Sequence, residues 1–593
     1  MLKPLDEMQI PTPANNQSSP IYRCHGHWAK RPFNIVRHCI EHFTKTGEIV
    51  LDPFAGYGTT GIEALISRRK TIITDLNPIS VFVAKVIVMP LPENGIQLYK
   101  NTIGQIEEMV YEKIMSLYET TCNCGKKAIV SSVIYDSKND ANDPRERIYH
   151  PRVIRIKCPN CGNIRRRPNK DDLKWIKEIN NIEIPYWYPK TALVYNTRKS
   201  VYKGMTVADL YTKRNLMAMS LLRDAIFRLH EGFCKELMKF TFSAIVRTAS
   251  MMVHEGGGGW QKSFHIPKKG MAERNVWEIF VRKCKDVIRC KEITQRLIGD
   301  YCREAKDFSE LEDDKTILIT KWDATQISNL IPERSIDYIH TDPPYGDNIQ
   351  YFELFLPNMA WLGMEQELNK EDWYKEIVIT DSPIFPEKSE KHYHELLVKA
   401  FVEMSKVIKP MKWITVWFAC QDENIWSALR DAITVAGFEE RKSYLVIRTS
   451  QQKSFGIKRQ KTIESLSKIL EHDLLVHCQM SGKPKPSIKL PKNVAVELFL
   501  KVAEQEIKRR GSATTGEIYM AFVNKCLTEY FTPPPNLNYK EILEGNKHFI
   551  SQQVTERIGN KYVTIEMWKL KDYEPPSKLT YYLKRNMRVN NED

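Results

Sequence analysis

The stretch EIVLDPFAGYGTTGIEALISRRKTIITD (residues 48–75) contains, in order, a short apolar run, a glycine-bearing loop, a helix-like segment and a second apolar run. The segments EIVLDPF and KTIITD have the apolar, β-branched composition of buried strands. Between them, TTGIEALISRR spaces its apolar residues as a helix does. The order strand, loop, helix, strand predicts an α/β fold built on a parallel sheet.

The glycine loop predicts a nucleotide-like ligand. Gly56 and Gly58 allow the backbone to adopt positive φ and to pass close to a ligand, and the helix beyond offers free amide donors. Asp75 ends the second strand, where an acid can accept hydrogen bonds from ribose hydroxyls. The loop has no Gly-Lys-Ser/Thr, and Asp52 would repel a phosphate. S-adenosylmethionine, which carries a sulfonium, an ammonium and a ribose, fits this pattern; a plain tight turn is the alternative.

A second motif, HTDPPYGD (residues 340–347), follows the apolar-leaning run SIDYI. Asp-Pro and Pro-Pro both favour turns, so a turn at the end of a strand is one interpretation. The other is a pocket that grips a planar ring bearing an amino group. The glycine loop elsewhere in the chain favours the second interpretation.

With both motifs considered, the chain resembles the S-adenosylmethionine-dependent DNA amino-methyltransferases, which make N6-methyladenine or N4-methylcytosine. DPFAGYGTT is similar to the cofactor motif of that family, and DPPY is similar to its catalytic motif. HGHWAKRP (25–32) resembles the family's His-x-x-Lys-Pro-like element, with an extra arginine. WDAT (322–325) resembles the segment that borders the adenine of the cofactor. The resemblance covers about 21–90 and 315–480.

The resemblance implies two sets of site residues. The residues implied for cofactor binding are Lys30, Pro32, Asp52, Pro53, Phe54, Gly56, Gly58, Thr59, Asp75 and Asp323. The residues implied for catalysis are Asp342, Pro343, Pro344 and Tyr345. The two sets are expected to lie side by side at the strand ends of one sheet.

The amine of adenine or cytosine is a poor nucleophile because its lone pair is delocalised into the ring. Asp342 and the carbonyl of Pro343 can accept its two hydrogens, which localises the lone pair for in-line attack on the sulfonium methyl. Pro344 keeps the loop rigid, and Tyr345 is expected to stack on the base. The base must first flip out of the duplex.

Several functions stay open at this point. An aspartate in DPPY favours adenine N6 over cytosine N4 as the methylated atom. An RNA guanine-N2 methyltransferase is a further alternative, since some such enzymes carry a similar motif. A catalytically inactive, zinc-containing DNA-binding subunit is the non-enzymatic alternative, although the intact Asp52, Asp75 and Asp342 argue against decay.

Two cysteine pairs predict a structural zinc site. CNCG (122–125) and CPNCG (158–162) supply Cys122, Cys124, Cys158 and Cys161, and a glycine follows each pair. Four cysteines in two close pairs are typical of a zinc ribbon, although the first pair is C-x-C instead of C-x-x-C. Free cysteines in a loop are the alternative.

The predicted fold is a Rossmann-like methyltransferase with a mostly parallel seven-stranded sheet. A zinc-containing, largely helical insertion splits it, and a small helical or winged-helix module follows. The predicted domains are a flexible tail (1–20), a first methyltransferase segment (21–95), the insertion (96–310, with the zinc ribbon at about 120–165 and a possible role in target recognition), a second methyltransferase segment (311–482) and the C-terminal module (490–593).

The charge of the chain predicts a polyanionic partner. Its net charge is +15 and its pI is near 9.0, which favours a nucleic acid over an ordinary lysine-rich surface. The resemblance to DNA amino-methyltransferases implies that this nucleic acid is double-stranded DNA. The thirteen cysteines are expected to be reduced, and no apolar run reaches the length of about 18 residues that a membrane span needs. We therefore expect a cytoplasmic, nucleoid-associated protein, with any restriction or defence partner on a separate chain.

Overall fold

The structure of the protein is a computed structural model, in which the chain forms two compact units. The described residues are 8–28, 30–139, 141–196, 201–258, 264–418, 422–447, 472–482, 488–529, 531–534, 537–558 and 561–573. The glycine-loop unit comprises Ala14–Pro332 and Gly346–Tyr393. The DPPY unit comprises Met1–Pro13, Glu333–Tyr345 and His394–Asp593.

A parallel sheet, in the order β10–β11–β2–β1, forms the base of the glycine-loop unit. Its strands are β1 (Ile49–Asp52), β2 (Lys70–Asp75), β10 (Glu304–Ala305) and β11 (Ile317–Lys321). The helices that accompany it are α1 (Pro20–Arg23), α2 (Phe33–Phe43), α3 (Thr59–Ile66), α4 (Pro78–Val88), α10 (Phe308–Glu312), α11 (Tyr351–Leu362) and α12 (Lys370–Lys375). The predicted strand, loop, helix and strand of residues 48–75 are therefore confirmed.

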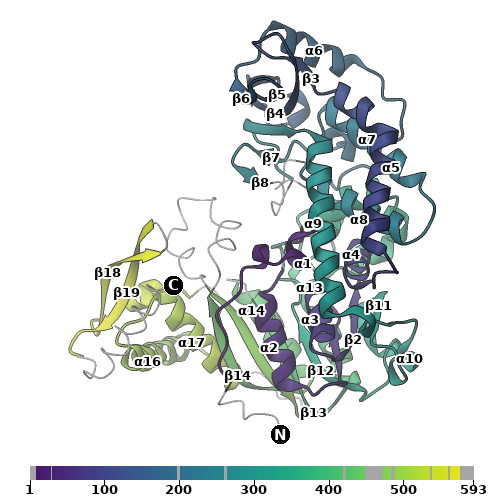
Figure 1. Cartoon of the computed structure of the whole chain (residues 1–593). Helices are drawn as coiled ribbons and strands as arrows, with labels where there is room; N and C mark the ends of the chain where they lie inside the picture. Colours follow the sequence, from purple (N-terminus) through teal and green to yellow (C-terminus); the bar gives the residue numbers. More distant parts are fainter. Residues whose placement is uncertain are drawn as a thin grey trace. The chain divides into compact units, whose positions relative to one another are not determined.

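The insertion after α4 combines helices with a second sheet. Its helices are α5 (Gly95–Ser116), α6 (Lys170–Asn181), α7 (Lys213–Phe227), α8 (Phe233–Ile245) and α9 (Val276–Leu297). Its strands are β3 (Glu119–Thr121), β4 (Lys127–Ser137), β5 (Tyr149–Cys158), β6 (Gly162–Arg166), β7 (Val253–His254), β8 (Gly257–Gly258) and β9 (Lys269–Arg274). They form a sheet in the order β6–β5–β4–β9–β7–β8, with β3 paired to β4. Figure 1 shows β3–β6 grouped beside α6, and α9 packs along α5 and α8.

This insertion sheet adds strands that the predicted, largely helical insertion did not include. The segments KAIVSSVIYDS and YHPRVIRIKC are rich in β-branched residues, and they form the long paired strands β4 and β5. The buried side chains Ile154, Ile156 and Cys158 alternate along β5, which is the period-two pattern of a strand with one face in the core. The prediction gave too much weight to the polar residues between these apolar positions.

The DPPY unit holds four paired strands, in the order β12–β13–β15–β14. They are β12 (Ile336–Thr341), β13 (Ile408–Phe418), β14 (Phe438–Ile447) and β15 (His472–Met480), with α13 (Glu390–Val407) and α14 (Glu423–Val435) in the same part of the chain. Strands β12 and β13 are parallel, whereas β15 runs antiparallel to both β13 and β14. The two units together confirm a mixed α/β protein.

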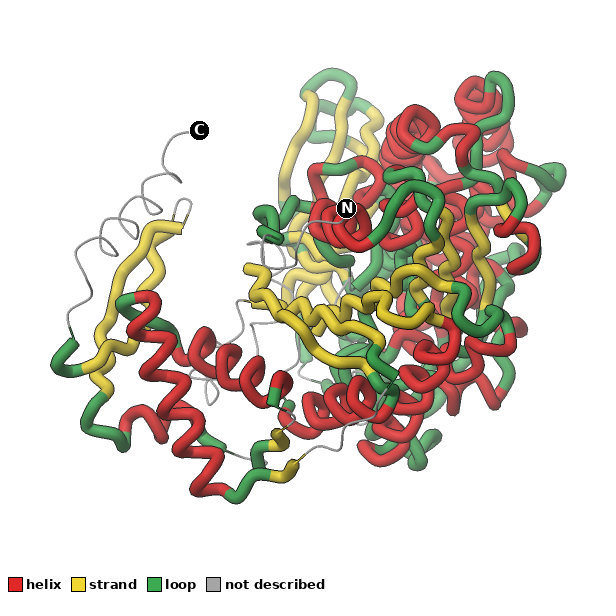
Figure 2. The backbone as a smooth tube through the Cα atoms, turned by 90° about the horizontal axis from the view of Figure 1, so that it is seen from below, coloured by secondary structure: helices red, strands yellow, loops and turns green. Residues whose placement is uncertain are grey.

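The C-terminal module consists of helices and a hairpin (Figure 2). Its elements are β16 (Ile488–Lys489), α16 (Lys492–Arg510), α17 (Thr515–Thr528), β17 (Phe531–Thr532), α18 (Tyr539–Glu544), β18 (Phe549–Ile558) and β19 (Lys561–Leu570). Helices α16 and α17 are the longest of these elements, and β18 and β19 pair antiparallel. None of the helices in the described parts of the chain is both long and apolar enough to cross a membrane.

Candidate active site and metal centre

The glycine loop is held in shape by acids at the ends of β1 and β2. Asp52 is buried, and its carboxylate accepts the backbone N–H of Phe54 at 3.1 Å and the hydroxyl of Thr60 at 2.6 Å. Asp75 accepts the backbone N–H of Gly56 and that of Asn77, both at 2.8 Å. Both acids therefore order the loop that joins the strand to the helix.

Asp75 orders the glycine loop, a role that the sequence did not suggest. Burial raises the pKa of Asp75 to about 6, against the lowering effect of the backbone N–H donors of Asn77 and Gly56. A carboxylate offers about four acceptor positions, so these two bonds leave capacity for ribose hydroxyls. The structure thus adds a loop-ordering role to the predicted ligand-binding role, which stays a prediction.

The two loop glycines adopt conformations that other residues rarely adopt. Gly56 has φ +52° and Gly58 has φ +83°. A Cβ at Gly58 would lie 2.8 Å from the Cβ of Ala84 in α4, and a Cβ at Gly56 would lie 3.0 Å from Cε1 of His27. Pro53 and Phe54 form the turn before Gly56. Helix α3 begins at Thr59, immediately after Gly58, so its N-terminus has no side-chain cap.

Replacing Gly58 with alanine is expected to destabilise the protein more than the same change at Gly47. Both glycines have φ +83°, but nothing lies within 4 Å of a Cβ built at Gly47. The left-handed backbone costs both variants about 1–2 kcal/mol, and overpacking against Ala84 costs Gly58→Ala about 1–3 kcal/mol more. Urea unfolding of the two variants measures this difference; equal free energies of unfolding would contradict the close packing.

The HGHWAKRP segment lies directly against the glycine loop. The Nζ atom of Lys30 is 3.7 Å from the centroid of the Tyr57 ring, and it donates to the backbone carbonyls of Tyr22 and His25, each at 2.5 Å. Burial lowers the pKa of Lys30 to about 7. Pro32 stands immediately before α2 as its N-cap. These contacts of Lys30 hold the HGHWAKRP segment against the glycine loop.

His27 and its aromatic neighbours were not among the predicted site residues. The His27 ring stacks on Tyr351 at 6.0 Å between ring centroids and lies 5.4 Å from Phe355, both residues of α11. Burial lowers the pKa of His27 to about 3, so its imidazole is neutral. The two histidines of the quoted motif were visible in the sequence, but only the structure places His27 beside Gly56.

The WDAT segment reaches the same end of the sheet. Strands β11 and β2 are parallel, with Lys321 opposite Asp75, and the backbone N–H of Trp322 donates to the carbonyl of Asp75 at 3.2 Å. Asp323 caps the 3₁₀ helix η6 (Ala324–Asn329), accepting the N–H and the hydroxyl of Thr325 at 2.8 Å each. Three predicted cofactor segments therefore converge on the ends of β1 and β2.

The DPPY motif occupies the end of β12 in the other unit. Tyr345 is 9% exposed, and its hydroxyl donates to the carboxylate of Asp342 and to the backbone carbonyl of Trp417, the latter at 3.2 Å. Its ring meets Phe418 edge-on at 5.0 Å. Of the two prolines, Pro343 is buried and Pro344 is half-buried. Tyr345 thus orients Asp342 through its hydroxyl, whereas stacking on a base stays a prediction.

A buried chain of hydrogen bonds lies beneath this motif. Nε1 of Trp417 donates to Nε2 of His340 at 2.8 Å, and Nδ1 of His340 lies 3.0 Å from the hydroxyl of Tyr338. That hydroxyl donates in turn to Thr415 at 2.6 Å. Fully satisfied buried networks rigidify the elements they join. These hydrogen bonds join β12 to β13 directly beside the DPPY loop, and the sequence motif did not predict them.

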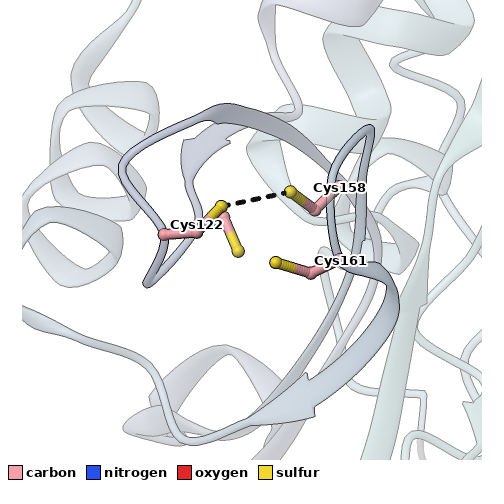
Figure 3. Close-up of side chains that lie close together, drawn as sticks. Cys122, Cys158 and Cys161 are labelled. Carbon is pink, nitrogen blue, oxygen red and sulfur yellow. Dashed lines mark hydrogen bonds between the residues drawn. The ribbon is translucent and has the colours of Figure 1, made fainter.

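The four predicted zinc ligands form one cluster in the insertion. The Sγ atoms of Cys122, Cys124, Cys158 and Cys161 all lie within 4.8 Å of one another, and those of Cys124 and Cys158 are 3.6 Å apart. Figure 3 shows the sulfurs of the three labelled cysteines turned toward a common centre. Zn–S bonds of about 2.3 Å place the sulfurs of a tetrahedral site about 3.8 Å apart, so this geometry fits a zinc ion.

The local backbone explains how the cysteines meet. Cys122 follows β3, and Cys158 ends β5, whose antiparallel partner β4 also pairs with β3. Gly125 and Gly162 have φ +80° and +71°, which lets each chain segment turn tightly after its cysteine pair. The insertion sheet therefore supplies the scaffold of the cluster.

Two further features of the sequence fall outside the described residues. They are the basic segment 448–461 and Trp260 at the end of the glycine-rich stretch HEGGGGW. Of that stretch, His254 forms part of β7 and Gly257 part of β8.

Comparison with known proteins finds similarity over short parts of the chain. Residues 7–85 match the family model described as DNA methylase. A 52-residue segment is 42% identical to the Type II methyltransferase M.Cfr9I of Citrobacter freundii. That match spans 9% of this chain and 17% of the relative, so it concerns a small part of both proteins.

Two solved structures are also similar at low identity. One is a Thermus thermophilus protein named as a DNA modification methylase, 14% identical over 37% of this chain and 89% of that protein. The other is phosphoethanolamine N-methyltransferase 1 of Haemonchus contortus, 9% identical over 75% of this chain and 90% of that protein. Both TM-scores are 0.14, so neither similarity supports a conclusion about the fold or function of this chain.

Proposed function

We propose that this chain, which resembles the DNA amino-methyltransferases, transfers a methyl group from S-adenosylmethionine to the exocyclic amine of a flipped base in double-stranded DNA, with adenine N6 as the acceptor. The convergence of three separate segments at the ends of β1 and β2 carries the proposal. The glycine loop, the Lys30 segment and the WDAT segment are far apart in sequence, yet they contact one another around Asp75 and Tyr57.

The cofactor supplies an electrophilic methyl group on its sulfonium when it is bound. The residues proposed to hold it are Lys30, Pro32, Asp52, Pro53, Phe54, Gly56, Gly58, Thr59, Asp75 and Asp323. Asp52 and Asp75 add negative charge near a cationic ligand, and the two glycines leave the loop backbone without side chains. Nζ of Lys30 also donates to the carbonyls of Tyr22 and His25, which keeps the Lys30 segment in place beside the proposed cofactor site.

At the DPPY motif, the proposal assigns Asp342 the role of hydrogen-bond acceptor for the target amine. Tyr345 already donates to one oxygen of Asp342, which holds the carboxylate in one orientation. The carbonyl of Pro343 is the proposed second acceptor, and Pro344 limits the movement of the loop. With both N–H bonds engaged, the nitrogen lone pair is free for in-line attack, and no covalent enzyme intermediate is needed.

Adenine N6 is favoured over cytosine N4 because the motif carries aspartate, and cytosine N4 stays the second candidate.

The domain boundaries predicted from the sequence are retained as part of the proposal, with the insertion as the candidate target-recognition element. Zinc is proposed at Cys122, Cys124, Cys158 and Cys161, where four thiolates leave no open position for catalysis. A separate restriction or defence partner also stays a prediction.

Product analysis tests the proposed reaction. The full chain is incubated with methyl-labelled S-adenosylmethionine and either amplified genomic DNA, which is free of methylated bases, or transfer RNA. Nucleosides from each digest are separated, and label is expected in N6-methyldeoxyadenosine from the DNA alone. Label in N4-methyldeoxycytidine would replace the base assignment, and label only in RNA would overturn the proposal.

A further inference from the structure

One face of the insertion sheet carries an uncompensated row of arginines. Arg165 in β6 lies directly opposite Arg155 in β5. Arg155 lies opposite Ser132 in β4, and Ser132 lies opposite Arg274 in β9. Directly opposed residues share a face of a sheet, so these positions form one line across four strands. At about 4.8 Å per strand, the line is about 14 Å long.

Helix α9 extends this positive surface. It begins two residues after Arg274, and its exposed residues Arg282, Lys285 and Arg289 are spaced as one helical face. Burial lowers the pKa of Arg274, and the charges of Arg282 and Arg155 lower it further, which places both guanidinium groups close to it. We call Arg155, Arg165, Arg274 and Arg282 the arginine row.

Three other basic residues of this sheet differ from the arginine row, because each has an acidic partner. Arg152 pairs with Asp136 at 2.9 Å, and Lys157 pairs with Glu278 at 2.9 Å. Arg166 pairs with Asp172. In contrast, no ion pair joins any member of the arginine row to an acid of the described residues.

Such an arrangement is unfavourable for the protein alone. Like charges directly opposite each other in a sheet are destabilising, and Arg155 and Arg165 are directly opposed. An anionic ligand removes this repulsion, and guanidinium groups match the geometry of phosphate. DNA carries one phosphate per 3.4 Å of helix axis on each strand, so a line of about 14 Å parallel to the axis spans about four phosphates of one strand.

We propose that the arginine row binds the phosphate backbone of the DNA duplex that carries the target base. The proposal rests on the proposed function, which makes double-stranded DNA the substrate. It assigns the insertion sheet to positioning of the duplex, because phosphate contacts fix the register of a protein on DNA without reading its sequence. The zinc cluster at the end of β5 and the start of β6 then stabilises the two strands that present Arg155 and Arg165.

The test removes two exposed arginines, Arg165 and Arg282, which lie in different elements of the surface. The dissociation constant of the Arg165→Ala/Arg282→Ala variant for duplex DNA is measured over a series of KCl concentrations. The slope of log K against log [salt] is expected to become shallower by about two, one for each lost phosphate contact. Zinc content and thermal unfolding confirm that the variant is folded.

The matched control removes two positive charges elsewhere in the same unit. Lys100 and Lys113 are exposed residues of α5, without an ion pair among the described residues. The Lys100→Ala/Lys113→Ala variant is expected to keep the wild-type salt slope. Equal slopes for the two double variants would overturn the proposal, as would a change of slope seen with single-stranded RNA but not with duplex DNA.

Methyl transfer separates this proposal from the proposed function. With saturating DNA, the Arg165→Ala/Arg282→Ala variant is expected to keep its kcat and to show a raised KM. If the wild-type protein transfers no methyl group to DNA, the proposed function fails, while the salt slopes still decide whether the arginine row binds duplex DNA.

Discussion

Replacing Asp342 with alanine is expected to lower kcat for methyl transfer by a factor of about 10²–10³, the range for loss of one preorganised hydrogen-bond partner of the transition state. The target amine would lose the acceptor that localises its lone pair, and the Tyr345 hydroxyl would lose the carboxylate to which it donates. The affinity for S-adenosylmethionine is expected to stay unchanged, because the proposed cofactor residues belong to other motifs. Steady-state rates and calorimetric titration measure the two effects.

Asp431 provides a matched control for this variant. It is an aspartate of α14 in the same unit, and its carboxylate pairs with His394 at 3.1 Å. Asp431→Ala is expected to keep kcat within about twofold, since surface ion pairs contribute little. Equal rates for Asp342→Ala and Asp431→Ala would remove the catalytic assignment of the DPPY motif.

The second large effect is expected at the cysteine cluster. Cys158→Ser is expected to reduce the zinc content from one ion per chain to none, because serine does not replace a thiolate ligand. Structural zinc contributes on the order of 10 kcal/mol to folding of the elements that it joins. The variant should therefore lose protection of β3, β4, β5 and β6 against hydrogen exchange, and elemental analysis measures the metal itself.

A chelator and a second cysteine complete this experiment. A strong zinc chelator should lower the thermal stability of the wild-type protein and leave Cys158→Ser unaffected. Cys234 is a half-exposed residue of α8 outside the cluster, and Cys234→Ser should retain the metal. An unchanged zinc content in Cys158→Ser would show that the four thiols do not form a metal site.

The sequence was informative where local pattern decides structure. The glycine loop between two apolar runs is present where it was predicted. The insertion was harder, because Arg155 and Lys157 alternate with Ile154 and Ile156 in a run that was predicted to belong to a largely helical insertion. Only pairing with β4 shows that this run is a strand.

The sequence by itself determined which chemical groups the protein has: a glycine loop with flanking acids, a DPPY turn and two cysteine pairs. These features are local, since each depends on neighbouring residues and on short-range backbone preferences. The tertiary structure alone decided that Asp75 binds Gly56, that Lys30 lies against Tyr57 and that three arginines align across the insertion sheet. The reason is register: a shift of one residue between strands moves every side chain to the opposite face, and long-range pairing sets that register.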